Sequence, residues 1–155
     1  MTTAAYPNPN DAKPTRRIDQ LIAHYGQSHQ NPRNEMIHFI AIPLIMLSLV
    51  GMLFALHPAA AYAFVAASMV YYLRLSVVLF LAMMLWSAIT LGLIFFMGSM
   101  VLPLCVTIFV GAWALQFVGH KIEGKKPSFF EDIQYLWVGP LFVLSKLFGK
   151  LGLRW

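Results

Sequence analysis

Long apolar tracts separated by very few polar positions occupy the middle of the chain. No Lys, Arg, Asp or Glu occurs in residues 36–73 or in residues 75–120, so Arg74 alone divides the two tracts. A helix of about 20 apolar residues crosses the roughly 30 Å hydrocarbon core of a bilayer. Each tract is long enough for two spans joined by a tight turn. The pattern therefore predicts an all-α integral membrane bundle of four transmembrane helices.

Turn-forming residues divide each tract once, at His57-Pro58 and at Gly98-Ser99. The four expected spans are residues 37–56, 59–73, 75–97 and 100–119. The second is short, because fifteen residues rising 1.5 Å each cover only about 22 Å. It needs local bilayer thinning or burial among its neighbours. Alanines spaced by four residues predict a face on this span that another helix can approach closely: Ala59, Ala63 and Ala67.

Polar segments flank the expected spans. Residues 1–35 are polar and lack the apolar centre of a signal peptide, so we expect a cytosolic leader that contains a short helix. In the last part, residues 121–155, Ser128 and Glu131 have the spacing of a helix capping box. Residues 135–148 are apolar but too few for a crossing, which predicts an interfacial or re-entrant helix. The membrane domain itself is expected over residues 36–120.

Positive charge is distributed unevenly along the chain. The 11 Lys and Arg residues precede the first span, follow the fourth, or lie at Arg74 in the connection between the second and third. Under the positive-inside rule this predicts that both termini are cytosolic. The expected location is the inner membrane of a bacterium or the endoplasmic reticulum of a eukaryote. Although the net charge is +5, the basic residues form no continuous stripe, which argues against nucleic acid as a partner.

Histidines gather at the cytosolic boundary of the expected bundle. Asn31 is a suitable cap for a helix that begins at Pro32, and the chain before that cap can fold back over the first turn. Such a fold brings His29 next to His38. His120 ends the fourth span at the same depth. Because ionisable groups at this depth are costly unless they are used, the three histidines predict a metal site.

Other residues add to this candidate site. His24 and Glu123 are further candidate ligands. Imidazoles with a carboxylate and no thiolate suit non-haem Fe(II), with zinc and manganese as alternatives. Positively charged side chains nearby are candidates for holding an anionic headgroup or a fatty carboxylate: Arg33, Lys125 and Lys126.

Two motifs contain the candidate ligands. They are His29-x-x-Pro32-x-Asn34-x-x-x-His38 and Gln116-Phe117-x-Gly119-His120. In combination they resemble the membrane 2-hydroxy fatty acid dioxygenase family, which is known from fungal phytosphingosine breakdown and from bacterial relatives. The resemblance extends over about residues 20–150.

The resemblance implies an activity and a set of site residues. It implies an Fe(II)-dependent oxygenase that uses O2, without oxoglutarate, to remove one carbon from a 2-hydroxy fatty acid. The partners would be this lipid substrate, O2 and the membrane, and an oligomer is possible. The implied metal ligands are His29, His38 and His120, and the implied orienting residues are Asn34 and Gln116. Glu123 departs from the fungal pattern, in which the acid lies one residue further from the histidine.

The residues leave other functions open. A non-enzymatic membrane scaffold or lipid-binding protein would use the histidines only for hydrogen bonds and would bind no metal. A di-iron membrane hydroxylase needs more histidines than the five in this chain. A transporter of this length would require oligomerisation, and no charged residue is expected mid-membrane to act as a relay.

Overall fold

The computed structural model describes residues 16–27, 29–124 and 135–153 of the chain. The regular elements within these residues are all helical, so the expected all-α class is confirmed. They are α1 (Arg17–Gly26), α2 (Pro32–Leu56), α3 (Pro58–Leu73), α4 (Val77–Met97), α5 (Val101–Glu123) and α7 (Val138–Leu151), with a short 3-10 helix at Gly98–Met100.

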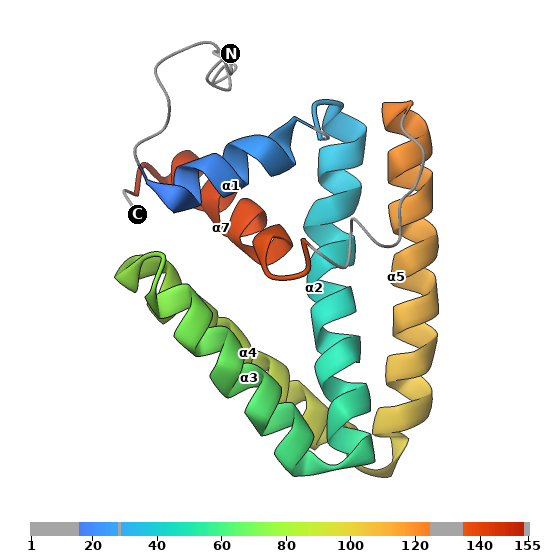
Figure 1. Cartoon of the computed structure of the whole chain (residues 1–155). Coiled ribbons are helices and arrows are strands. Elements are labelled where there is room, and N and C mark those ends of the chain that lie inside the picture. Colours follow the sequence, from blue (N-terminus) through green and yellow to red (C-terminus); the bar gives the residue numbers. More distant parts are fainter. Residues whose placement is uncertain (1–15, 28, 125–134, 154–155) are drawn as a thin grey trace.

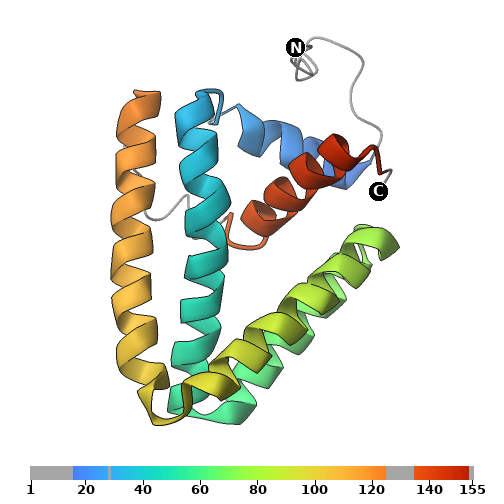
Figure 2. The ribbon, with the colours of Figure 1, turned by 180° about the vertical axis from the view of Figure 1, so that it is seen from behind.

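The long helices are arranged as a V (Figure 1). Helices α2 and α5 lie side by side and antiparallel, and α3 pairs with α4 in a second arm that leaves α2 at an angle (Figure 2). Helices α1 and α7 cross each other in the opening of the V, and α7 contacts α1, α2 and α4. The turns that join α2 to α3 and α4 to α5 lie together at the closed end. The start of α2 and the end of α5 therefore meet at the open end.

Local sequence explains where α2 begins and ends. The Asn31 side chain accepts a hydrogen bond from the Arg33 backbone N–H at 3.0 Å, and Pro32 is the first helical residue, as predicted. At the other end His57 is extended, and its Nδ1 accepts from the Ala59 N–H at 3.2 Å. His57 thus separates α2 from α3 and caps α3, which confirms the expected turn.

The connection between α4 and α5 depends on a glycine. Gly98 has a φ of 53°, a region that side chains with a Cβ rarely adopt. This backbone redirects the chain at the closed end, so that α4 runs down one arm of the V and α5 returns along the other. The turn was expected at this position. Helix α4 starts at Val77, two residues later than predicted, because the Ser76 hydroxyl caps it.

Large apolar side chains cover the outer surface of the arms. Leu85 of α4 is 64% exposed and Val110 of α5 is 63% exposed. Two segments are long and apolar enough to cross a membrane, Pro32–Leu56 and Val77–Glu123, and Pro58–Leu73 is a shorter apolar helix of 16 residues. An exposed apolar surface of this extent is unusual for a soluble protein and suits contact with lipid.

Two expectations about α3 and α7 were wrong in detail. The predicted alanine face is exposed, at positions 59, 63 and 67. Instead α3 packs through Ser68, whose hydroxyl accepts from the Trp137 indole N–H at 2.9 Å, and through Tyr72, which donates to the Trp137 carbonyl at 3.3 Å. Because Trp137 belongs to a turn, α7 begins at Val138 and not at residue 135. The expected capping box at Ser128 and Glu131 lies outside the described residues.

Candidate metal centre

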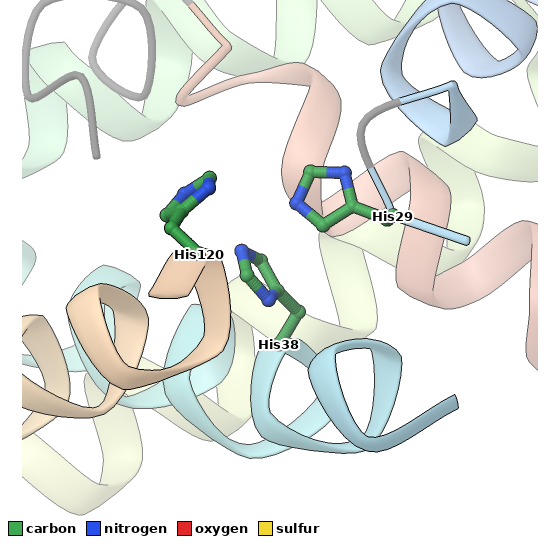
Figure 3. Close-up of side chains that lie close together, drawn as sticks. All are labelled: His29, His38 and His120. Carbon is green, nitrogen blue, oxygen red and sulfur yellow. The ribbon is translucent and has the colours of Figure 1, made fainter. Parts of the chain in front are cut away.

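Three histidines from separate parts of the chain meet at the open end of the bundle. His38 projects from the second turn of α2, His120 from the last turn of α5, and His29 from the segment between α1 and α2. Their rings face one common space (Figure 3). The ring centroids are 4.1 Å apart for His29 and His38, and 5.3 Å apart for His38 and His120. All three side chains are buried, with exposures of 2%, 0% and 6%.

Backbone carbonyls fix the protonation of two of these rings. Nδ1 of His29 lies 2.8 Å from the Tyr25 carbonyl, and Nδ1 of His38 lies 3.0 Å from the Asn34 carbonyl. A carbonyl oxygen only accepts hydrogen bonds, so each Nδ1 carries a proton and donates it. Nε2 of each ring therefore carries a lone pair in the neutral imidazole. Nδ1–H to carbonyl bonds of this type commonly orient metal-binding histidines.

The geometry fits a metal ion. The nitrogens that the three rings can offer all lie within 4.8 Å of one another. Two nitrogens that are each about 2.1 Å from one ion are at most about 4.2 Å apart. Small ring rotations would therefore allow all three nitrogens to bind the same ion. Nε2 of His38 is buried and has no hydrogen-bond partner among the described residues. A buried polar atom of this kind is costly unless something binds it.

Glu123 forms hydrogen bonds with the start of α2 and the residues before it, and not with the three histidines. One carboxylate oxygen accepts hydrogen bonds from the backbone N–H groups of Gln30 and Asn31, at 3.0 and 3.3 Å. The other oxygen accepts from the Asn31 N–H at 3.0 Å and from the Asn34 side-chain amide at 2.9 Å. Several N–H donors on one carboxylate favour its charged form. Glu123 thus joins the end of α5 to the start of α2 and to the segment just before it.

A glycine allows the two helices to approach at this point. A Cβ added at Gly119 would overlap Oδ1 of Asn34 and would lie 3.4 Å from Cε1 of His38. Helices α2 and α5 can bring His38 and His120 together only because residue 119 has no side chain. Gly119 lies inside the second motif, but its steric role could not be recognised without knowing which helix packs against it.

The remaining predicted site residues are placed differently. His24 is exposed, and its Nδ1 lies 2.7 Å from the Tyr135 hydroxyl, apart from the three-histidine cluster. Gln116 is buried one turn before His120. Arg33 is exposed in the first turn of α2. Lys125 and Lys126 lie outside the described residues.

Comparison with known proteins now gives the family. The profile of the 2-hydroxy-palmitic acid dioxygenase Mpo1-like family matches residues 15–151. The chain belongs to this family. A relative is the 2-hydroxy-palmitic acid dioxygenase MPO1 of Saccharomyces cerevisiae, which is 28% identical over 138 residues, covering 83% of this chain and 78% of the yeast protein. No solved structure matches the chain. The predicted resemblance is confirmed.

Two contacts in this Mpo1-like chain were not predicted from its sequence. Tyr25 stacks on His29, with ring centroids 4.2 Å apart, in addition to its carbonyl contact. The spacing of four residues between Tyr25 and His29 is the one sequence feature that could have indicated this contact. Lys146 of α7 forms an ion pair with Glu35 of α2 at 3.0 Å. No sequence pattern linked these two residues, since 111 positions separate them.

Proposed function

We propose that this protein is a membrane-embedded iron dioxygenase that shortens a 2-hydroxy fatty acid by one carbon. The observation that carries the proposal is the buried cluster of His29, His38 and His120, in which carbonyls orient two of the rings. Membership of the Mpo1-like family supplies the class of substrate.

Fe(II) is the ion that we assign to the cluster. The donor set is imidazole nitrogen without thiolate, which suits iron and leaves zinc and manganese as alternatives. Three protein ligands leave positions for a substrate and for O2. When bound, the ion supplies the redox chemistry with O2.

The residues of the chain have supporting roles in this proposal. The Tyr25 and Asn34 carbonyls hold the imidazoles in position, and burial of the rings keeps bulk water away. Glu123 is a positioning residue, because its oxygens already accept N–H hydrogen bonds from α2 and the preceding segment. Arg33, together with Lys125 and Lys126, is proposed to attract the substrate carboxylate.

The overall reaction balances with O2 as the oxidant. The bond between C1 and C2 of the 2-hydroxy acid breaks. C1 leaves as CO2, C2 becomes the carboxylate carbon of the shortened acid, and water takes the remaining oxygen. No further reductant is required.

We also propose that the chain crosses the membrane four times. Helices α4 and α5 have 21 and 23 residues, α2 has 25, and α3 is the short member of the bundle. With an even number of crossings the histidine cluster and both termini would share one side of the membrane, which the positive-inside rule makes the cytosolic side. A substrate carboxylate would then rest at headgroup depth, with its tail among the helices.

Incubation of purified protein with 2-hydroxypalmitate tests the activity. With Fe(II) and O2 we expect pentadecanoate and CO2, and under argon we expect neither. The same result with the H38A variant as with wild type would contradict the proposal. A scaffold or lipid-binding protein, the alternative, would retain no iron and form no product under either condition.

A further inference from the structure

A cavity adjoins the histidine cluster on the side toward the closed end of the bundle. Its volume is about 30 Å³, and its walls come from α1, α2, α5, the turn before α7 and the start of α7. Two of its lining residues, Ile42 and Gln116, lie four positions further into the bundle than His38 and His120 respectively. Since four residues make about one helical turn, the cavity begins one turn beyond the cluster.

Gln116 lines this cavity and lies one helical turn before His120. Its side chain is 4% exposed, and Oε1 has no hydrogen-bond partner among the described residues. A buried amide oxygen in this state is stabilised by any ligand that donates a hydrogen bond to it. The hydroxyl group of a 2-hydroxy acid is such a donor. The polar head of the ligand therefore belongs at this end of the cavity.

A second cavity lies further along α2. Its volume is about 20 Å³, and it lies between α2, α3 and α4, with Val50, Phe64 and Trp86 among its walls. Met46 lines both cavities. The thioether side chain of Met46 is thus the partition between them.

These features follow one face of α2 in order. His38, Ile42, Met46 and Val50 are spaced by four residues, and all of them are buried. The face passes from the histidine cluster to the first cavity, then to the partition, then to the second cavity. Twelve residues at 1.5 Å give a path of about 18 Å, close to the extended length of a palmitoyl chain. Val50 belongs to a packed cluster with Ile94 and Cys105, which closes the far end.

We infer that the hydrocarbon tail of the substrate lies along this face of α2, and that Met46 sets which tail lengths are accepted. The inference rests on the proposed function for the identity of the head group. The first cavity, at about 30 Å³, is smaller than an acyl tail, so even a short tail has to move apart the side chains that line it. A long tail displaces the Met46 side chain, which is unbranched and flexible, and enters the second cavity.

Variants at Met46 test the effect on tail length. Turnover of 2-hydroxyoctanoate, 2-hydroxymyristate and 2-hydroxypalmitate is compared for each protein. M46F blocks the path, so we expect kcat/KM to fall by about tenfold or more for the long acids relative to the short one. M46A joins the cavities and shifts the preference toward long acids. The matched control is M84F, since Met84 is 48% exposed on the outer face of α4 and lines neither cavity.

Tryptophan quenching tests the path without turnover. Trp113 lines the first cavity and Trp86 the second. In full-length protein under argon, with Trp137 and Trp155 replaced by Phe, each reporter is kept in turn. A 2-hydroxy acid brominated near its carboxylate should quench Trp113 more strongly, and one brominated at its methyl end should quench Trp86 more strongly. M46F should abolish the Trp86 response and keep that of Trp113. M84W, without the other tryptophans, reports non-specific partition into the detergent.

The two experiments separate failure of the path from failure of the proposed function. Unchanged length preference in M46F and M46A, or equal quenching of both reporters by both probes, overturns the path even if wild type shortens the acids. If wild type shortens none of the acids but the reporters respond in the expected order, the path stands and the activity fails. Should M46A not fold, M46F and the quenching order decide the outcome.

Discussion

Glu123, the last residue of α5, accepts a hydrogen bond from the Asn34 side chain in the first turn of α2 at 2.9 Å. The Asn34 backbone carbonyl in turn lies 3.0 Å from Nδ1 of His38. One residue therefore links the α5 carboxylate to the orientation of a candidate metal ligand. This link explains why two motifs far apart in sequence act on a single site.

Replacing Glu123 with Gln should weaken the centre without removing it. The amide group puts an N–H opposite the donors of Gln30, Asn31 and Asn34, so at least one of these partly buried or exposed donors loses its acceptor. We expect a loss of about 1–3 kcal/mol in the free energy of unfolding. Iron affinity should fall by about 10- to 100-fold. Thermal unfolding in detergent and iron titration measure the two effects.

Glu35 provides the matched control for this substitution. Glu35 lies in the first turn of α2, next to Asn34, but pairs with Lys146 of α7. E35Q should leave iron affinity unchanged and cost at most about 1 kcal/mol, since its ion pair is partly exposed. Complete loss of iron in E123Q would instead make Glu123 a ligand. Wild-type stability and affinity in E123Q would contradict the link described above.

The three cluster histidines should each be required for metal retention. We expect H29A, H38A and H120A to lose most of the bound iron, because each removes one of three neighbouring nitrogen donors. H24A and H57A should retain it, since His24 contacts Tyr135 and His57 caps α3 at the closed end. Elemental analysis of purified variants measures the iron content. Equal iron in all five variants would refute the site.

The start of α2 and its turn into α3 could be predicted because the signals are local. The side chain of Asn31, before Pro32, accepts from the backbone N–H two positions further on, and the side chain of His57, before Pro58, does the same. The cluster could also be predicted in outline. Once α2 starts at Pro32, His29 has to lie beside its first turns, and the depth of His120 follows from the length of α5.

Contacts between distant elements could not be predicted from the sequence. The alanine spacing in α3 indicated a packing face, yet α3 packs through Ser68 and Tyr72, because Trp137 of a distant turn supplies their hydrogen-bond partners. Helices α1 and α7 lie in the opening of the V, and no sequence pattern indicated that they would meet there. Apolar helices without a polar face give no indication of which side will be buried.

Gly119 and Gly111 should respond in opposite directions to the same substitution. G119A introduces a methyl group that overlaps Asn34, so α5 has to move away from α2 and the His38–His120 pair opens. We expect reduced iron affinity and lower stability. G111A is the control, because a Cβ at Gly111 meets nothing within 4 Å. Alanine is the better helix former by about 0.5–1 kcal/mol, so G111A should keep iron and be slightly more stable.

Thermal unfolding and iron titration compare the two glycine variants. Both variants add the same methyl group to the same helix, so a difference between them comes from its surroundings. We expect the free energy of unfolding to fall in G119A and to rise slightly in G111A. Wild-type iron affinity in G119A would show that the close approach of α2 and α5 is not needed for the centre.

Cysteine labelling should place the start of α2 and the end of α5 on the same side of the membrane. The positive charges lie near the termini and at Arg74, and the connections at the closed end carry none. In a background with Cys105 replaced by Ala, single cysteines at Gln27 and Lys121 should react with an impermeant maleimide only after the membrane is opened. A cysteine at Ser99, in the turn between α4 and α5, should react in intact cells or vesicles of native orientation.

Ala55 supplies a second reporter at the closed end, because it is exposed near the end of α2. Its cysteine variant should behave like that at Ser99, since an odd number of crossings separates each of these two connections from the termini. Reaction of the Gln27 and Lys121 positions from opposite sides would require an odd number of crossings between them. His29 and His120 would then face different compartments, and no ion could be shared between them.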